Sequence, residues 1–453
     1  MSKRLYIFAA ILLVLSMVLA ACAPTATSQP TATTAVSEAT DTAEPTAMDE
    51  PTETAEPATE TAEPAAQATS TTVALVPTDA TATCKADTFG CVTIKPGDPI
   101  KIGMGGPMTG DNAAYGLDSA QAAKIAVSDA GMFNGFGFEL DAQDDQGTPE
   151  GGAAVANKFV SDPQIAAIEG HVFSGASGAA MPIYEKAGYV MLSGSATNPG
   201  LTQKGSKVFN RGVFTDAVQG KFAAAYIHDT LKFTKVVVMH DGTTYGQGLA
   251  EVVRDELTKL GTAPIAFQAI TPGESDYTSV LADIASKSPE IIFYGGYAAE
   301  AAVIVNEMKQ SGLDKTIFFG DDGTYGTDFI DRTKANGEGS YATSLVPPGS
   351  PAVTAYNAAY EKAYGQKPGK LSPYSWTAYD AAAVLIKAIE SVAILGTDGN
   401  LYIPRSALIA AVRGTKDYQG LSGVISCDAT GECGSSGPVF YIVKDGDWVE
   451  APK

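Results

Sequence analysis

Short apolar runs and amphipathic segments alternate along the chain from residue 98 onward. The apolar runs have the length of buried strands, and the segments between them carry apolar residues at helical spacing, so the pattern predicts strands and helices in alternation. The predicted strands cover residues 100–104, 138–142, 165–169, 189–192, 235–239, 265–270, 290–293 and 316–319. The predicted helices cover residues 119–130, 148–161, 175–187, 248–260, 277–286 and 298–311, with Pro182 interrupting the third.

The alternation occurs in two series, separated near residues 211–216. Strands joined through helices form parallel sheets with right-handed crossovers, so two series predict an α/β fold with two Rossmann-like lobes. The remainder of the chain predicts helices at 351–364, 377–392 and 406–412. A strand pair is then expected around 422–426 and 438–443.

The N-terminus has the layout of an export signal. Lys3 and Arg4 precede an apolar run at 5–20, which ends in small residues before Cys22. This order is typical of a secretory signal peptide and is short for a membrane-spanning helix. The sequence Leu-Ala-Ala-Cys at 19–22 resembles the lipobox of bacterial lipoproteins, which implies a signal peptide at 1–21 and a lipid anchor on Cys22. The alternative is an ordinary signal peptide that is cleaved nearby.

Residues 23–83 have the composition of a tether. Thr, Ala, Pro, Glu and Ser dominate, the unit Thr-Ala-Glu-Pro recurs, and the segment has ten acidic residues but no Lys, Arg or aromatic residue. Such a segment cannot bury enough apolar surface to offset its ordering entropy. We therefore expect residues 22–83 to form a lipid anchor and a disordered linker, followed by a Cys-containing lead-in at 84–97.

Four further cysteines form two close pairs, Cys84 with Cys91 and Cys427 with Cys433. Three connectivities are possible, and loop-closure entropy favours the two local pairings. The spacing does not fit a zinc site of the C-x2-C kind, and no His partners are present. Structural disulfides in an oxidising compartment are therefore the expected state.

The charge balance excludes several classes of protein. Lys and Arg number 30 against 51 Asp and Glu, for a formal net charge of −21, which argues against a nucleic-acid binder. Hydrophobic residues make up 45%, but no interior stretch reaches the roughly 18 apolar residues of a membrane span. Channels and polytopic transporters are therefore excluded. Three His residues leave little for a metal site, and we expect no metal and no cofactor.

Parallel α/β folds bind ligands at the carboxyl ends of their strands, so the residues that follow each predicted strand are informative. Ser174 and Thr197 offer hydroxyl and N–H donors near helix starts, which suits a carboxylate. Asp322 can accept from an ammonium group. Together these residues predict a cleft for a small zwitterion. The candidate ligand-binding residues are Tyr115, Phe173, Ser174, Ser195, Ala196, Thr197, Tyr245, Tyr297 and Asp322.

The ordered set of segments after these strands resembles the leucine/isoleucine/valine-binding proteins, which are type I periplasmic binding proteins of ABC importers. The resemblance covers residues 98–453 and implies two lobes joined by three crossovers, near residues 212–215, 342–345 and 418–423. Lobe 1 would comprise 98–213 and 344–421, and lobe 2 would comprise 214–343 and 422–453. The segments that carry the resemblance are Tyr115-Gly116, Gly170-His171, Ser195-Ala196-Thr197, His240-Asp241, Tyr294-Gly295-Gly296-Tyr297 and Trp376-Thr377-Ala378-Tyr379-Asp380.

The resemblance also implies how an amino acid is held. Ser174 and Thr197 would hold its carboxylate. The carbonyl of Ser195, Thr197 and Asp322 would hold its ammonium group. Tyrosines 115, 245 and 297 would line its side chain. Two departures bear on specificity, because Asp322 stands where branched-chain binders have Glu and Phe173 stands where they have a small residue.

Ordinary structural roles compete with these assignments. Ser174 and Thr197 can act as helix caps, and Asp322 can be a solvated loop charge. Tyr245-Gly246 and Gly295-Gly296-Tyr297 can be ordinary strand-to-helix turns, in which glycine supplies a positive φ. His171 is expected to be a structural hydrogen-bonding residue rather than a catalytic one.

Enzymatic motifs are missing from the sequence: it has no G-x-x-x-x-G-K phosphate loop and no H-E-x-x-H, and residues 175–178 fail the nucleophile-elbow pattern. The missing motifs argue against an enzyme, and the resemblance implies a solute-binding lipoprotein of an ABC importer. It would capture a branched-chain or similar small apolar amino acid by lobe closure and deliver it to a permease with its ATPase subunits. The alternatives are a binding protein for an amide, urea or carboxylate, or a ligand-sensing receptor domain. We expect a monomer on the outer face of the cytoplasmic membrane, in the periplasm or at the cell surface, held only by its lipid anchor.

Overall fold

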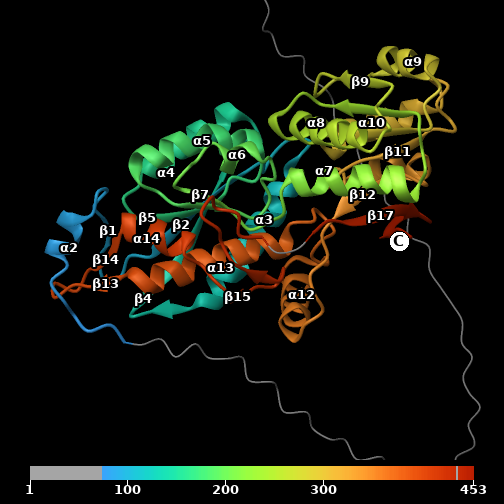
Figure 1. The fold of residues 1–453 in the computed structure, drawn as a ribbon. Coiled ribbons are helices and arrows are strands. Elements are labelled where there is room, and N and C mark those ends of the chain that lie inside the picture. The colour runs from blue at the N-terminus through green and yellow to red at the C-terminus, as the bar shows by residue number, and fades with distance from the viewer. Residues whose placement is uncertain (1–73, 435–436, 453) are drawn as a thin grey trace, which may run out of the picture. The chain divides into compact units, whose positions relative to one another are not determined.

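The computed structural model describes residues 74–434 and 437–452, which fold around two large sheets (Figure 1). The predicted signal peptide, Cys22 and most of the predicted tether lie outside the described residues. Within the described residues, no helix has both the length and the apolar character needed to cross a membrane.

The first large sheet has six strands in the order β3-β4-β2-β5-β6-β7. All neighbours are parallel except β3 and β4, which form an antiparallel pair. Figure 1 shows α4 and α5 on one side of this sheet and α13 on the other. We call this sheet with its helices the first lobe. Its elements are β2 (Ile100–Gly106), α3 (Ala113–Ala130), β3 (Met132–Phe133), β4 (Phe136–Asp144), α4 (Pro149–Ser161), β5 (Ile165–Gly170), α5 (Ser174–Ala187), β6 (Met191–Ser193), α6 (Gly200–Gln203), β7 (Phe209–Arg211), α12 (Pro351–Tyr364), α13 (Ser375–Val392) and α14 (Arg405–Arg413).

The second large sheet has seven strands in the order β18-β17-β12-β11-β10-β8-β9. The strands from β12 to β9 are parallel, whereas β17 pairs antiparallel with both β12 and β18. We call this sheet with its helices the second lobe. Its elements are α7 (Asp216–Ala225), the π-helical turn η1 (Tyr226–Thr230), β8 (Val236–His240), α8 (Thr244–Lys259), β9 (Ala266–Ala269), α9 (Thr278–Ser286), β10 (Ile291–Gly295), α10 (Ala298–Met308), β11 (Ile317–Phe319), α11 (Thr327–Thr333), the 3-10 turn η2 (Lys334–Gly337), β12 (Tyr341–Ser344), β17 (Val439–Lys444) and β18 (Asp447–Glu450).

The two-lobed α/β architecture and most predicted elements are confirmed, but the last predicted strand pair is wrong. β16 (Val424–Ile425) pairs with β15 (Tyr418–Gln419), while β17 joins the second large sheet. The two strands therefore have different partners. Residues near β16 instead contact the edge of the first sheet, where Cys433 N donates to Arg211 O at 2.8 Å.

Residues 74–97 also differ from expectation. Within the stretch assigned to the disordered linker, Thr78 forms a bridge with Gly396, Ala80 is buried, and α2 (Thr81–Ala86) begins. β1 (Cys91–Ile94), β14 (Leu401–Pro404) and β13 (Ile394–Leu395) form a small antiparallel sheet. The disulfide Cys84–Cys91 joins α2 to this sheet, in the predicted local pairing. The end of the linker is ordered because it packs against this sheet.

Helix α3 begins six residues before the predicted helix and so carries Tyr115 in its first turn. The sequence places Gly116 in a loop, but the structure uses it inside the helix. A Cβ on Gly116 would lie 1.9 Å from the carbonyl oxygen of Pro107, so only glycine permits this close approach of helix and loop. The glycine thereby fixes the position of the neighbouring Tyr115.

Other local signals behave as expected. Thr148 caps α4 by accepting from Gly151 N at 3.0 Å, and Pro149 occupies the first helical position. The predicted interruption at Pro182 is wrong, however, because α5 runs through it from Ser174 to Ala187.

Candidate functional site

Most candidate residues follow the carboxyl ends of parallel strands. In the first lobe, Ser174 begins α5 shortly after β5, and Ser195 and Thr197 follow β6. In the second lobe, Tyr245 lies in the first turn of α8, after β8, and Asp322 follows β11. The structure brings these ends together, because side chains from both lobes contact one another there.

An aromatic cluster crosses between the lobes. Phe173 of the first lobe stacks on Tyr297 of the second, with ring centroids 4.0 Å apart and planes at 15°. Tyr115 meets Phe173 edge-on at 5.5 Å, and Tyr245 lies 5.2 Å from Tyr297. All four side chains are buried. The predicted aromatic residues therefore form one continuous wall.

The space left between these groups is small. The cavity has a volume of about 10 Å³, which accommodates roughly one water molecule. An amino acid is larger, so the aromatic rings or the lobes must move to admit one. The cavity is lined by Val172, Phe173, Ser174, Ser195, Tyr245, Tyr297 and Tyr374.

Asp322 is fully buried and accepts hydrogen bonds from three side chains. Gln219 Nε2 donates to Oδ1 at 2.6 Å, the Tyr245 hydroxyl also donates to Oδ1, and the Tyr374 hydroxyl donates to Oδ2 at 2.5 Å. Burial raises the pKa of Asp322 above its usual 3.8, and the two tyrosine hydroxyls act in the opposite direction. The carboxylate is therefore not a solvated loop charge.

Further carboxylates lie buried beside Asp322. Asp321 accepts from Gly296 N at 2.9 Å through Oδ2, while its Oδ1 has no partner. Asp216 has no partner on either carboxylate oxygen. Burial raises the pKa of both groups well above 3.8, and the charge of Asp322 raises each further. This part of the cleft favours a positively charged group.

The candidate hydroxyl groups differ in availability. Ser195 Oγ donates to Val172 O at 2.7 Å, so it is engaged within its own lobe. Ser174 Oγ accepts from Asn198 N at 3.2 Å and keeps its proton for another acceptor. Thr197 Oγ1 is buried and makes no hydrogen bond. Ser174 and Thr197 are therefore the hydroxyls that are free to serve a ligand.

The loop that carries Thr197 is held by Arg211 on β7. Arg211 Nη1 donates to the carbonyls of Ala196 and Asn198, each at 2.9 Å, so the carbonyl of Ala196 is already used. The guanidinium group also binds Glu432 through Nε at 2.9 Å and Nη2 at 2.5 Å.

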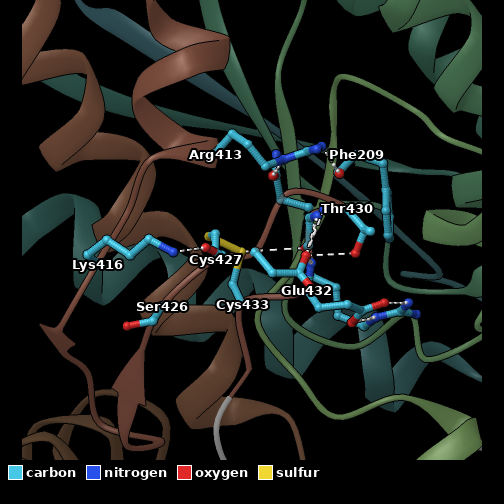
Figure 2. Close-up of a disulfide and its surroundings, with 12 residues drawn as sticks. Phe209, Arg413, Lys416, Ser426, Cys427, Thr430, Glu432 and Cys433 are labelled. Atoms are coloured by element: carbon cyan, nitrogen blue, oxygen red, sulfur yellow. Dashed lines mark hydrogen bonds and ion pairs between the residues drawn. A yellow bond between two sulfur atoms is a disulfide. The ribbon is translucent and has the colours of Figure 1, made fainter.

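Glu432 belongs to the tight turn closed by the disulfide Cys427–Cys433, in the predicted local pairing (Figure 2). The turn is fixed to the first sheet by Arg413, which donates to Phe209 O at 2.8 Å and to Ala429 O at 2.8 Å. This disulfide turn therefore supports the loop around Thr197 through Arg211.

Three more hydrogen bonds join the lobes around the cleft. The Tyr115 hydroxyl donates to Gly323 O. Asn198 Nδ2 donates to Thr244 O at 2.6 Å, and Arg332 Nη2 lies 3.1 Å from Asp111 Oδ1. Together with the bond between Tyr374 and Asp322, these contacts hold the strand ends of the two lobes against each other.

His171 has the structural role expected of it. It is buried in the first lobe, with Nδ1 2.7 Å from Asp145 Oδ2 and Nε2 2.9 Å from the Tyr184 hydroxyl. Both ring nitrogens are thus occupied by residues of its own lobe. Over residues 74–434 and 437–452, no group of three or more His, Cys, Asp or Glu side chains is arranged to hold a metal ion.

Sequence reasoning missed three residues of the cleft, Asp216, Gln219 and Tyr374. Asp216 and Gln219 lie one turn apart on α7, which begins directly after the first predicted crossover. Tyr374 immediately precedes α13 and lies two residues before Trp376, just outside the segment 376–380 that carries the resemblance. For Asp216 and Gln219, the sequence offered one signal: polar residues in the first turn of a helix that directly follows a predicted crossover. For Tyr374, the signal was its position just before the segment that begins at Trp376.

Comparison with known proteins agrees with this architecture. The family model described as Periplasmic binding protein matches residues 99–447. The amino acid binding protein of Pseudomonas aeruginosa is 33% identical over 297 residues, which are 63% of this chain and 76% of that protein.

Two solved structures are similar over nearly their full length. One is a leucine binding protein from Thermotoga maritima, with a TM-score of 0.71 and 28% identity, covering 78% of this chain and 98% of that chain. The other is a branched-chain amino acid transporter substrate binding protein from Streptococcus pneumoniae in complex with isoleucine. Its TM-score is 0.69 at 27% identity, covering 78% of this chain and 100% of that chain.

Proposed function

The chain belongs to the periplasmic binding protein family, and on this premise we propose that it is an extracytoplasmic solute-binding protein that captures an amino acid between its lobes. Relatives named as amino acid, leucine and branched-chain amino acid binding proteins support this ligand class.

One observation carries the proposal: the two lobes present complementary groups across the cleft. The first lobe offers the hydroxyls of Ser174 and Thr197, and Ser174 lies at the N-terminus of the 14-residue helix α5, a favourable place for a carboxylate. The second lobe offers the buried carboxylate of Asp322 to an ammonium group. An amino acid carries both of these groups on one carbon atom.

In this proposal the ligand carboxylate binds Ser174 and Thr197, and the ammonium group binds Asp322, the Thr197 hydroxyl and the Ser195 carbonyl. The rings of Tyr115, Tyr245 and Tyr297 enclose the side chain. A branched-chain amino acid is the first candidate, because a solved relative holds isoleucine.

A smaller ligand is the second candidate, and the position of Phe173 favours it. The ring stacks on Tyr297 at 4.0 Å and fills volume that a bulky side chain needs. A small ligand requires less displacement of the Phe173 and Tyr297 rings than a branched-chain amino acid does. Such ligands are alanine, glycine, a small amide, urea or a small carboxylate.

We also propose the setting in which the protein works. It docks as a monomer on an ABC permease with its ATPase subunits and performs no catalysis. The lipobox-like sequence supports a lipid anchor on Cys22, which holds the protein on the outer face of the cytoplasmic membrane. The proposed boundaries of the lobes are 98–213 with 344–421, and 214–343 with 422–453, although the disulfide turn at 427–433 contacts the first sheet. The Cys22→Ser variant should leave the membrane fraction, and its continued retention there would contradict the anchor.

A thermal-shift screen of the full chain tests the ligand class. The protein is unfolded and refolded to remove bound solute, then heated with each amino acid, short amides, urea and small carboxylates. A ligand at 100 times its Kd stabilises a protein by about 2.7 kcal/mol, which the screen detects. A shift with amino acids supports the proposal. A shift only with compounds that lack an ammonium group would overturn the role of Asp322.

A further inference from the structure

Asn198 connects the first lobe to the second at the rim of the cleft. It follows Thr197 in the loop after β6, and its Nδ2 donates to the carbonyl oxygen of Thr244, the first residue of α8, at 2.6 Å. Oδ1 of the same side chain accepts from Gly200 N at 2.8 Å. A carbonyl on one side and an N–H on the other fix which way the amide points. The side chain therefore bonds both to its own loop and to the opposite lobe.

Gly248 leaves the space that this side chain occupies. It lies inside α8, one turn after Thr244. A Cβ at Gly248 would lie 2.3 Å from Nδ2 and 3.5 Å from Cγ of Asn198. Apart from the chain neighbours of Gly248 and the backbone of its own helix, no other described atom comes within 4 Å of that position. The second lobe alone would therefore accept a larger residue here, and glycine is needed because of the contact with the first lobe.

The backbone of Asn198 is fixed on the first lobe. Its N–H donates to Oγ of Ser174 at 3.2 Å, and its carbonyl oxygen accepts from Nη1 of the fully buried Arg211 at 2.9 Å. Asn198 thus adjoins both residues that are proposed to bind the ligand carboxylate, Thr197 in sequence and Ser174 through a hydrogen bond. A ligand bound by these two residues would also hold Asn198 in position.

A second polar contact between the lobes, Arg332 with Asp111, lacks this fit. Nη2 of Arg332 lies 3.1 Å from Asp111, while Nε lies 2.8 Å from Asp328 in its own helix. The side chains of Arg332 and Asp111 are 37% and 73% exposed, and exposed ion pairs contribute little to stability. The contact of Asn198 is therefore the stronger candidate for holding the rim closed.

We propose that Asn198, Thr244 and Gly248 form an interlobe latch, which stabilises the closed arrangement of the lobes without touching the ligand. The inference rests on the proposed function and adds Asn198 to it as a positioning residue. The latch exists only while the lobes are closed, because its parts belong to different lobes. A contact made only in the closed state favours closure and so raises the affinity for a ligand that the closed state holds.

The first test is calorimetric titration of the refolded full chain and its variants with L-leucine, L-alanine, glycine, urea and acetate. Asn198→Asp keeps an acceptor for Gly200 N and loses only the donor to Thr244 O. Gly248→Ala fills the space beside Asn198 and so displaces its side chain. We expect each change to weaken amino-acid binding by about three- to tenfold.

A double-mutant cycle shows whether the two residues act through one contact. Once Asn198→Ala has removed the side chain, the methyl group of Gly248→Ala meets no atom of the first lobe. The double variant Asn198→Ala with Gly248→Ala should therefore bind the ligand as well as Asn198→Ala alone. Independent effects would instead multiply.

The second test separates the latch from a structural role in the second lobe. Alanine favours a helix more than glycine does, and Gly248 has free space when the lobes part. In Gly248→Ala, Tm without ligand should therefore stay the same or rise while affinity falls. Stopped-flow measurements should show most of the loss in affinity as faster ligand dissociation.

Two variants away from the latch serve as matched controls. Gly178→Ala lies in α5, where a Cβ would meet only Leu201 Cδ2 at 3.6 Å, an ordinary contact. Asn157→Ala removes an exposed side chain of α4 that donates to Ala153 O in its own helix. We expect both controls to keep the affinity of the wild type within about twofold.

The outcomes separate this inference from the proposed function. If the wild-type chain binds an amino acid but Asn198→Asp and Gly248→Ala keep its affinity, the inference is overturned and the proposed function stands. Multiplied losses in the double variant, or a lower Tm in Gly248→Ala, also overturn the inference. If only urea or acetate binds and the latch variants weaken that binding, the inference stands and the proposed function is overturned. Binding of none of the five probes contradicts both.

Discussion

The hydroxyl of Tyr374 donates to Oδ2 of Asp322 at 2.5 Å, and this bond joins the two lobes. Tyr374 precedes α13 of the first lobe, whereas Asp322 follows β11 of the second. The loop of Tyr374 is itself fixed, because Ser372 and Ser375 both donate to the buried Asp118. The contact is therefore a preformed link between the first lobe and the proposed ammonium-binding carboxylate.

Removal of the Tyr374 hydroxyl should weaken ligand binding. Tyr374→Phe leaves Oδ2 of Asp322 buried without its donor, so the carboxylate is less well oriented for an ammonium group. We expect a loss of about 1–2 kcal/mol in binding free energy, measured by calorimetry with L-leucine and L-alanine. The control is Tyr364→Phe, whose hydroxyl donates to Gln121 O away from the cleft. Equal affinity of Tyr374→Phe and the control would refute a role for this link.

Phe173 should set the size of the side chain that the cleft accepts. Phe173→Ala removes the ring that stacks on Tyr297 and opens the small cavity. We expect the affinity ratio of L-leucine over glycine to rise by at least about tenfold, because one extra buried branched side chain gains about 1.5–3 kcal/mol. Phe222→Ala, which truncates a half-exposed ring on α7, should leave the ratio unchanged. An unchanged ratio in Phe173→Ala would place the side-chain pocket elsewhere.

Glu432 should matter for both stability and binding. Its carboxylate is the acidic partner of the fully buried Arg211, which holds the carbonyls on either side of Thr197. Loss of one partner of a buried ion pair costs about 3–5 kcal/mol, and the value here should lie near the lower end because Glu432 is partly exposed. Glu432→Ala should therefore lower the free energy of unfolding by about 3 kcal/mol and weaken amino-acid binding several-fold.

The control for Glu432 is Asp255→Ala, which removes one partner of an exposed ion pair with Arg254. Such pairs contribute about 0–1 kcal/mol, so denaturant unfolding should show little change. If Glu432→Ala were as mild as this control, Arg211 would not depend on the disulfide turn.

The stability of the protein should fall as the pH rises from 5 to 8. Burial raises the pKa of Asp241 to about 7 and that of Asp380 to about 6, from 3.8. A carboxyl group with a raised pKa binds its proton more tightly in the folded state. Its stabilising effect is therefore complete below the unfolded value and is lost as the pH rises through the folded value. We expect the free energy of unfolding to drop by at least about 2 kcal/mol over this range.

The net negative charge of the protein also grows with pH, and its repulsion also lowers stability. Asp241→Asn separates the contribution of the Asp241 carboxyl group to the pH dependence from this repulsion. Oδ1 of Asp241 accepts from Thr243, while Oδ2 has no partner, so the amide can replace the carboxylate. The variant should show a smaller loss of stability between pH 5 and pH 8 in denaturant unfolding. An identical slope in variant and wild type would show that Asp241 does not titrate in this range.

The alternation of apolar runs predicted the lobes because parallel α/β units form from local segments. β8 and α8, for example, lie within a few residues of their predicted ranges. The place of β17 in the sheet was not predictable in this way, since it comes from pairing with β12, which lies about a hundred residues earlier. Local pattern gives a strand, but not its partner.

The residues of the candidate site also fall into two groups, those that a local pattern predicts and those that only the tertiary fold places. Ser174, Thr197, Tyr245 and Asp322 were found because they follow strand ends, and the structure brings their neighbourhood together. Asp216 begins α7 and Tyr374 immediately precedes α13, and the folding of the lobes against each other gives both residues their places. A lone Asp or Tyr at a helix start has no distinguishing local pattern.

Calorimetric titration of the refolded full chain with L-leucine, L-isoleucine, L-valine, L-alanine and glycine tests the central claim most directly, with Asp322→Ala as the paired variant. The account predicts that at least one of these amino acids binds with one site per chain, and that Asp322→Ala weakens binding by at least about tenfold. Binding that Asp322→Ala leaves unchanged, or binding of urea, amides or carboxylates in place of all five amino acids, would contradict it.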